Sequence, residues 1–195
     1  MKSLTKYLNE KLIINKDYKN SYTYAPTSFD ELREIIEDRY DKLGAGTKTN
    51  PIDFNDVDVS NISSFYDNDI NIGIFERTKF KYINISDWDV SNVESMNTMF
   101  WNCNSLVSVG DLSNWDVSNV KNMGRMFCIC KQLKSVGDLS NWDVSNVKNM
   151  YRMFFYCEKI KSVGDLSNWN VSNVKDMKYI FGNSGITNIP GWYKK

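Results

Sequence analysis

The sequence predicts an α/β solenoid, a stack of about four to five strand–helix coils behind an N-terminal helical cap. The first observation is a repeat: the string SNWDVSNVKNM occupies residues 113–123 and recurs, letter for letter, 27 residues later at 140–150. The second is that four apolar residue types recur at the same offset. They are Trp88, Trp115, Trp142 and Trp169; Val90, Val117, Val144 and Val171; Met96, Met123, Met150 and Met177; and Phe100, Phe127, Phe154 and Phe181. A third, physical point is that one such unit cannot bury its apolar side alone, so successive coils must share a core.

The first predicted segment, residues 1–25, is a tail or docking segment. Residues 3–12 carry apolar side chains at the spacing of a short helix, and a polar, tyrosine-rich stretch follows up to Pro26. Short helices persist only with tertiary contacts. The segment therefore either packs on the cap or docks on a partner, and both alternatives remain open.

The second segment, residues 26–50, is the predicted helical cap. Ser28 followed by Glu31 forms the signature of a capping box, and Gly44 is a suitable helix stop. Apolar residues near one face of this helix are expected to cover the first coil. They are Phe29, Leu32, Ile36 and Leu43.

The third segment, residues 51–195, holds the predicted repeats, and a degenerate copy at 54–62 places their start near Pro51. Within one coil, Trp115 and Val117 alternate as in a short strand, and apolar residues from Val120 to Cys130 follow at helical spacing. Ser118 or Asn119 is the expected N-cap of that helix.

A return loop and a C-terminal cover complete this segment. A turn at Gly137 and Asp138 is expected to bring the chain back to the next strand. The atypical half coil from Ile186 to Tyr193, with Ile189, Pro190 and Trp192, is expected to cover the last coil.

The string NWDVSNVKNMYRMFFYC at residues 141–157 resembles the BspA-like leucine-rich-repeat surface proteins of bacteria and some eukaryotic microbes. The resemblance extends from Pro51 to about Gly182. The string FDELREIIEDRY ahead of DFNDVDVS is similar to the head of short, signal-less members encoded by gut Bacteroidetes and their bacteriophages. The resemblance implies a leucine-rich-repeat-like solenoid and protein-binding roles such as adhesion. It carries over no catalytic residues.

Composition excludes several classes of function. The 24 basic and 24 acidic residues balance, so no overall field favours nucleic acid or an anionic membrane. Histidine is absent, which removes Ser-His-Asp and Cys-His nucleophile pairs and histidine-bound metals. We therefore expect no enzymatic activity, no cofactor, no metal and no membrane insertion. The apolar run at residues 12–14 is too short for a secretory signal, so the expected location is the cytoplasm, or the virion if the chain is phage-encoded.

Four polar or thiol columns also recur, and a structural interpretation of them is weighed against a ligand-binding one. Buried thiols or a metal stack would explain the cysteines, and turn capping or a calcium ladder would explain the aspartates. The asparagines fit an internal hydrogen-bonded ladder. In each case we favour the structural interpretation. The columns are Cys103, Cys130 and Cys157; Asp89, Asp116 and Asp143, continued by Asn170; Asp111, Asp138 and Asp165; and Asn92, Asn119, Asn146 and Asn173.

Positions that differ between coils carry the predicted binding surface. On a helix with Val120 and Phe127 buried, a step of 100° per residue points three positions outward. These positions hold Lys121, Arg125 and Cys128, with counterparts Glu94, Thr98 and Trp101; Lys148, Arg152 and Phe155; and Lys175, Tyr179 and Gly182. Exposed aromatics beside arginine are typical of protein-binding hot spots. The predicted protein-binding residues are Trp101, Arg125, Cys128, Arg152, Phe155 and Tyr179. The alternative is that another part of the chain covers them.

These observations predict a non-enzymatic protein-interaction or scaffolding module whose partner is another protein. The alternative is a bacteriophage virion or assembly protein that docks through its N-terminal segment. An adhesin or an aspartate-based, metal-dependent enzyme is a weaker alternative.

Overall fold

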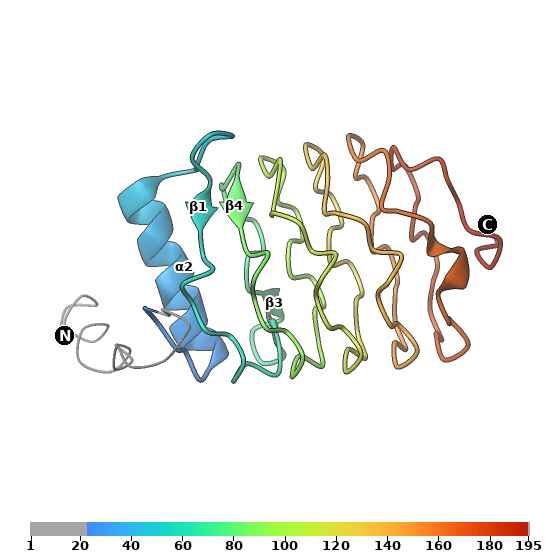
Figure 1. The fold of residues 1–195 in the computed structure, drawn as a ribbon, viewed down its shortest axis with the longest axis horizontal. Coiled ribbons are helices and arrows are strands. Elements are labelled where there is room, and N and C mark those ends of the chain that lie inside the picture. The colour runs from blue at the N-terminus through green and yellow to red at the C-terminus, as the bar shows by residue number, and fades with distance from the viewer. Residues whose placement is uncertain (1–22, 195) are drawn as a thin grey trace.

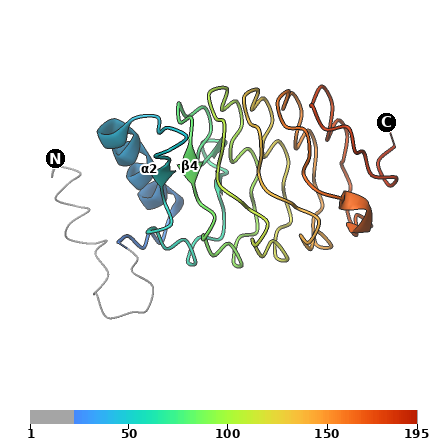
Figure 2. The same ribbon diagram turned by 45° about the horizontal axis from the view of Figure 1, so that its top comes forward.

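The computed structural model describes residues 23–194, and within them successive coils of the chain lie side by side between a helix at one end and the C-terminal residues at the other (Figure 1). The same arrangement is seen when the molecule is tilted (Figure 2). Parallel bridges join equivalent positions of neighbouring coils, for example Asn122 with Asn149 and Ser108 with Ser135. The elements are α2 (Phe29–Leu43), β1 (Ile52–Asp53), β2 (Tyr66–Asp67), β3 (Ile72–Gly73), β4 (Ile83–Asn84) and the short 3₁₀ helix η1 (Leu166–Asn168).

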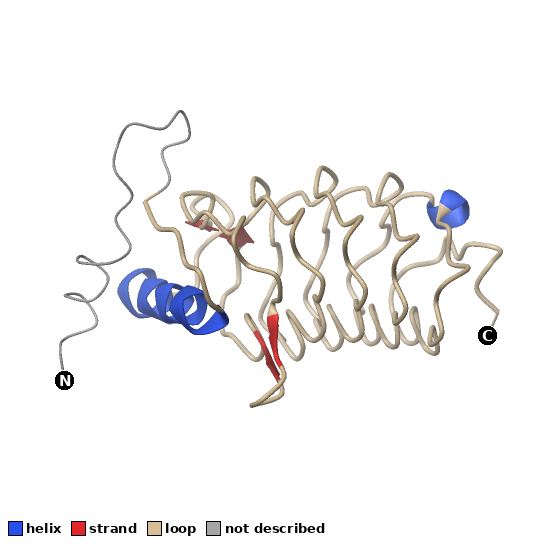
Figure 3. Cartoon of the chain, turned by 90° about the horizontal axis from the view of Figure 1, so that it is seen from below, coloured by secondary structure: helices blue, strands red, loops and turns tan. Residues whose placement is uncertain are grey.

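The predicted fold class, an α/β solenoid of strand–helix coils, is wrong. In the described residues there is one α-helix, α2, and two sheets of two strands each: β1 pairs with β4 in parallel, and β2 pairs with β3 antiparallel. Figure 3 shows that loops and turns make up most of the rest. The segment 120–130, predicted as a helix, is a series of turns.

Backbone hydrogen bonding explains why no helix forms in the coils. The N–H groups of Met123, Arg125 and Phe127 donate to carbonyls of the next coil at 2.9, 2.7 and 2.9 Å. The intervening N–H groups of Met126 and Cys128 donate to the carbonyl three residues back. An α-helix instead needs a bond to the carbonyl four residues back at every position. Because every second N–H group bonds to a neighbouring coil, the segment cannot be helical.

Short polar side chains fix this turn conformation locally. The side-chain oxygens of Asn122 and Asn149 accept from the N–H groups of Gly124 and Tyr151, each at 2.9 Å. Such bonds from a side chain to the backbone two residues on compete with helix formation. The apolar spacing of three to four residues was therefore wrongly interpreted as a helix. The inward-facing positions of successive turns recur at the same interval as those of a helix.

The apolar columns form the core, as predicted, except that Val171 and Met177 of the last coil are only half-buried. The Phe100, Phe127 and Phe154 rings stack with centroids 5.3 and 5.4 Å apart. The rings of Trp142 and Trp169 stack at 6.5 Å and lie 1° from parallel. Each buried indole N–H in the tryptophan column donates to a carbonyl of the preceding coil, so these polar atoms are satisfied. The column therefore supplies both apolar contact and a hydrogen bond between coils.

Helix α2 begins and ends at the predicted residues. The Ser28 hydroxyl accepts from the Glu31 N–H at 3.2 Å, and the Gly44 N–H bonds to the Tyr40 carbonyl. The Glu31 carboxylate reaches the N–H of Thr27, one residue before the position that a capping box requires. Leu43 is 63% exposed at the last turn, so its predicted place in the apolar face is wrong.

The helix covers the first coil through Leu32, Ile35 and Ile36, which are buried. Its Arg39 bonds to Asp56 and lies over the Phe54 ring at 5.0 Å, so the helix and the first coil are also joined by charge. No helix within residues 23–194 combines the length and apolarity needed to cross a membrane.

Most of the predicted tail, residues 1–22, lies outside the described residues, and so does its docking role. The described end of that segment pairs with the first coil: the Thr23 N–H donates to the Asp56 carbonyl at 2.7 Å, and Tyr24 bridges to Val57. At the other end Trp192 stacks on Trp169 at 6.2 Å. The division into tail, cap and repeat segments stays a prediction.

Candidate functional site

In successive coils two positions have a left-handed backbone although neither holds a glycine: the later one holds Asn102, Ile129, Tyr156 and Asn183, and the earlier one holds Thr98 and its counterparts. The φ of the earlier position is 51° at Thr98, 54° at Arg125, 55° at Arg152 and 59° at Tyr179, and Asn71 has 58°. Non-glycine residues rarely adopt such angles, at a cost on the order of 1 kcal/mol each. The N–H groups of Thr98, Arg125 and Arg152 each bond to the next coil at 2.7 to 3.0 Å, which holds them in this conformation. We call these five residues the left-handed column.

The left-handed column and its neighbours form a surface in which arginines lie over aromatic rings. Arg77 lies 4.6 Å from the centroid of Trp101, and Arg125 lies 4.8 Å from that of Tyr151. Arg152 lies 4.7 Å from the Phe155 centroid and close to two further rings. We call this surface the arginine–aromatic face: Arg77, Trp101, Arg125, Tyr151, Arg152, Phe155, Tyr156 and Tyr179.

A cavity of about 450 Å³ adjoins this face. Two polar atoms of its lining are buried without a hydrogen-bond partner among the described residues: the Thr98 hydroxyl oxygen and Nε of Arg152. Thr98 is 7% exposed. The lining consists of Tyr66, Asn71, Glu76, Asn97, Thr98, Trp101, Arg125, Cys128, Ile129 and Arg152. A buried unpaired polar group costs about 1–3 kcal/mol, so the two atoms mark a place where a polar ligand would be favoured.

One acid lies in the cavity wall and is already engaged. Glu76 is 6% exposed, and its carboxylate accepts from the Gly73 N–H at 3.1 Å. Its other oxygen is 3.5 Å from Nε of Arg77. The carboxylate is therefore balanced by Arg77, which leaves Arg125 and Arg152 as positive charges in the lining.

The structure brings the predicted binding residues together, with one correction to their directions. Trp101, Arg125, Cys128 and Arg152 line the cavity, and Phe155 and Tyr179 join them through their contacts with Arg152. Cys128, predicted to point outward, is 2% exposed.

Burial raises the pKa of the Cys128 thiol to about 11, against the opposing effect of Arg152 and Arg125. The thiol is thus protonated at neutral pH and is a poor nucleophile. Its N–H bonds back to the Arg125 carbonyl, a turn that places it below the surface.

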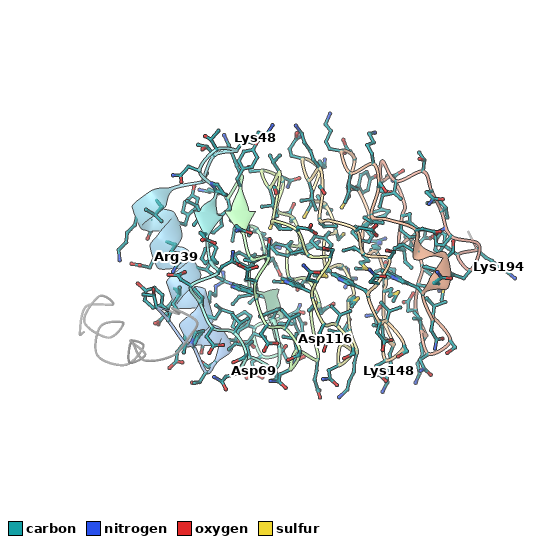
Figure 4. All side chains as sticks on the ribbon, viewed as in Figure 1. Arg39, Lys48, Asp69, Asp116, Lys148 and Lys194 are labelled. Atoms are coloured by element: carbon teal, nitrogen blue, oxygen red, sulfur yellow. The ribbon has the colours of Figure 1, made fainter. Side chains whose placement is uncertain are left out.

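Thr98 was likewise expected to point outward and is buried instead. The lysine positions agree with the prediction: Lys121, Lys148 and Lys175 are exposed, and Lys148 extends from the molecular edge in Figure 4. Lys121 pairs with Glu94 of the preceding coil at 2.7 Å.

Several residues of the site were missed. Tyr151 occupies a position that holds Asn97 and Gly124 in other coils, so its variation was a signal that could have been used. No variation between coils marks Glu76, because it precedes the part of the chain in which the repeat pattern is clear.

The structural interpretation of the cysteine column is confirmed. Cys103, Cys130 and Cys157 are fully buried, and each thiol donates to a carbonyl of the preceding coil at 2.9 to 3.0 Å. Burial raises the pKa of Cys157 far above its ordinary value. Within residues 23–194, no group of three or more cysteine, aspartate or glutamate side chains has the arrangement of a metal site.

The aspartate columns cap turns, as predicted. Asp116 and Asp143 accept from the N–H groups of Ser118 and Ser145 at 3.0 and 2.9 Å. Asn170 makes the same bond to Ser172 at 3.2 Å, which explains why an uncharged side chain is tolerated there. The asparagine column bonds to carbonyls of the preceding coil, but at the surface: Asn92, Asn119, Asn146 and Asn173 are exposed, so the predicted internal ladder is an external one.

Comparison with protein families gives one match. Residues 68–192 match the family described as "Mycoplasma protein of unknown function, DUF285". The chain belongs to this family. The matched region contains the whole arginine–aromatic face, from Arg77 to Tyr179. No curated protein and no solved structure shows a significant match.

Proposed function

We propose that the chain is a non-enzymatic protein-interaction module that binds a partner protein through its arginine–aromatic face. The observation that carries the proposal is the left-handed column, in which the same backbone conformation supports asparagine, threonine, arginine and tyrosine side chains in different coils. Stacked arginine and aromatic side chains are enriched in the energetic centres of protein interfaces. The repeats thus supply a constant frame, and the column supplies the variable contacts.

Two exposed tyrosines on this face support the proposal. Tyr156 and Tyr179 are 38% and 53% exposed, although most other large apolar and aromatic residues of the described chain are buried or half-buried. Tyrosine is favoured at interfaces because it offers a rigid apolar ring with a polar end. A partner would bury these rings.

A non-enzymatic role fits the chemistry of the site. The sequence has no histidine, the Cys128 thiol is held protonated, and the Glu76 carboxylate is engaged by Gly73 and Arg77. The site thus has neither an imidazole base nor a thiolate nucleophile.

The proposal also places the chain beside the BspA-like surface repeat proteins. The matched family is related to the BspA-like surface repeat proteins, and the DVSNV motif at residues 143–147 supports placing the chain beside them. A protein-binding role such as adhesion is then inherited from the resemblance. The expected location in the cytoplasm or a virion stays a prediction.

The test compares variants in partner capture. The wild-type chain and a Tyr156→Ser/Tyr179→Ser variant are immobilised and exposed to extract from the cells that encode the chain, and retained proteins are identified by mass spectrometry. Affinity for a purified retained protein is then expected to fall by about 30-fold or more in the variant, as for a loss of hot-spot residues. Thermal melts should stay close, because both rings are exposed.

The matched control is Leu43→Ser, which removes another exposed apolar side chain, from the end of α2. It should retain the same proteins as the wild type. If the double tyrosine variant retains them equally well, the proposed face is not the binding surface.

A further inference from the structure

We infer that the cavity beside Thr98, Arg125 and Arg152 is a carboxylate-binding pocket, which takes an aspartate or glutamate side chain of the protein partner. The inference rests on the proposed function, because it names the chemistry that the arginine–aromatic face recognises. Four observations support this assignment of the pocket.

The first observation is that the cavity contains polar atoms with nothing to bond. Nε of Arg152 and the Thr98 hydroxyl are buried and unpartnered among residues 23–194, and both residues line the same cavity. A guanidinium can only donate hydrogen bonds. The missing group is therefore an acceptor that reaches Arg152, and the Thr98 hydroxyl can donate to it as well.

The second observation is charge. Neither Arg125 nor Arg152 forms an ion pair with any acid in the described part of the chain, whereas Arg33 and Arg39 pair with Glu37 and Asp56. The one acid of the lining, Glu76, is balanced by Arg77 at 3.5 Å. The pocket therefore favours an anion.

The third observation selects the kind of anion. The Glu76 carboxylate stays in the cavity wall, and it would repel a doubly charged phosphate more than a singly charged carboxylate. Arginine pairs with planar carboxylates through parallel hydrogen bonds. A carboxylate thus matches both the donors and the net charge of the pocket.

The fourth observation is size and shape. A volume of about 450 Å³ holds a side chain with its carboxylate and lies within the range of small-ligand sites. Trp101 lines the same cavity and offers an apolar wall for the methylene groups that carry the carboxylate. A glutamate or aspartate side chain presents both parts.

A pair of isosteric probes tests this chemistry without the partner. N-acetylglutamate α-amide and N-acetylglutamine α-amide differ only in that the first carries the side-chain carboxylate. Each is titrated into ¹⁵N-labelled full-length chain at constant ionic strength. The Arg152 Nε–H and Trp101 indole resonances report binding, and they are assigned from the spectra of Arg152→Lys and Trp101→Phe.

We expect the glutamate probe to shift both resonances saturably with a dissociation constant of about 1 mM, as for a ligand of its size. The glutamine probe should bind at least about tenfold more weakly, because it leaves the arginine without a charged acceptor. Equal shifts with both probes would show that the pocket does not select the carboxylate, and no shift with either would show that neither binds; each result would overturn the inference. Tighter binding of inorganic phosphate than of the glutamate probe would overturn the choice of carboxylate.

Variants then locate the site. Arg152→Met and Thr98→Val should each weaken the glutamate probe by about tenfold, the expected effect of losing one hydrogen bond to a charged group. The control Lys48→Met also removes one positive charge. In Figure 4 Lys48 lies at one edge of the molecule, and Asp69, which follows strand β2, lies at the opposite edge. The control should bind like the wild type.

Thr98→Val guards against a folding artefact. It removes the unpartnered hydroxyl while keeping the shape, so its melting temperature should equal or exceed that of the wild type. If Thr98→Val and Arg152→Met bind the glutamate probe as tightly as the wild type does, the anion binds elsewhere and the inference is wrong.

The two proposals fail separately. If the glutamate probe does not bind but the tyrosine variant still loses the partner, the pocket is refuted and the binding face stands. If the probe binds but the tyrosine variant keeps the partner, the face is refuted and the pocket stands as an anion site.

Discussion

The buried columns and the left-handed column occupy the same coils yet follow opposite rules. In the phenylalanine column every residue is identical from Phe100 to Phe181, and neighbouring rings stack within 5.3 to 6.2 Å. In the left-handed column the backbone angle is constant near 55°, but the five positions hold four different residue types, with arginine at two of them. A constant side chain preserves the packing of the core, whereas a constant backbone angle preserves the direction in which the side chain points. The comparison teaches that each repeat separates the residues that stabilise the core from a position where the side chain can vary, which is where we propose that recognition takes place.

The largest expected effect is on the buried side of this comparison. Phe127→Ala removes a fully buried ring between Phe100 and Phe154, so it should lower the free energy of unfolding by about 3–5 kcal/mol. Denaturant unfolding followed by tryptophan fluorescence measures it. The control Tyr179→Ala, on the left-handed column, should cost less than about 0.5 kcal/mol. Similar losses in both variants would remove the distinction between the two columns.

The tryptophan column should show a smaller, polar contribution. Trp142→Phe keeps an aromatic ring but leaves the Leu112 carbonyl without the indole donor that lies 2.9 Å away. The unpaired buried acceptor and the lost ring volume should cost about 2 kcal/mol in thermal unfolding. A loss below about 0.5 kcal/mol would show that water or another group replaces the indole.

The left-handed column predicts a difference between two small residues. Thr98→Gly should be more stable than Thr98→Ala by about 1 kcal/mol, because only glycine adopts a φ near 51° without steric cost. Melting temperatures of the two purified variants measure it. If the alanine variant equals or exceeds the glycine variant, the left-handed angle is not imposed by the coils.

The smallest effect concerns the aspartate caps. The hydroxyl and N–H of Ser145 lower the pKa of Asp143 below its ordinary value of 3.8, so this cap contributes stability above that pH and loses it as the pH falls through the lowered pKa. Asp143→Asn copies the cap that Asn170 already makes. It should change stability by less than about 0.5 kcal/mol at pH 7 and weaken the acid dependence below pH 3.8. Unchanged acid dependence in melts from pH 7 to pH 3 would contradict this.

The sequence was sufficient for the contents of the core but not for its conformation. Recurrence of Trp142 and Phe127 at one offset shows that each fills a fixed place, since a repeated large residue is best explained by repeated packing. The same recurrence does not distinguish a helix from a series of turns, because both return to one face every three to four residues. The decision depended on bonds between coils, which are contacts distant in sequence.

The sequence likewise predicted some residues of the candidate site but not all of them. Arg125, Arg152 and Tyr179 were found because they vary within a regular frame. Cys128 was assigned to the wrong side because a helical step of 100° does not describe a turn with a left-handed residue. Glu76 closes the pocket from an earlier part of the chain, and no periodicity indicates that contact.

Many of the hydrogen bonds between coils join backbone atoms, and this has a consequence for how such a chain can grow. The N–H groups of Met123, Arg125 and Phe127 bond to the coil 26 residues ahead without regard to their side chains. A duplicated 27-residue segment placed between two coils would therefore find donors and acceptors already in register. Its left-handed residue would add one more side chain to the face formed by that column. The bonds between the two separated coils would be replaced by equivalent bonds to the inserted segment, so the chain can lengthen by whole segments without a change in its bonding pattern.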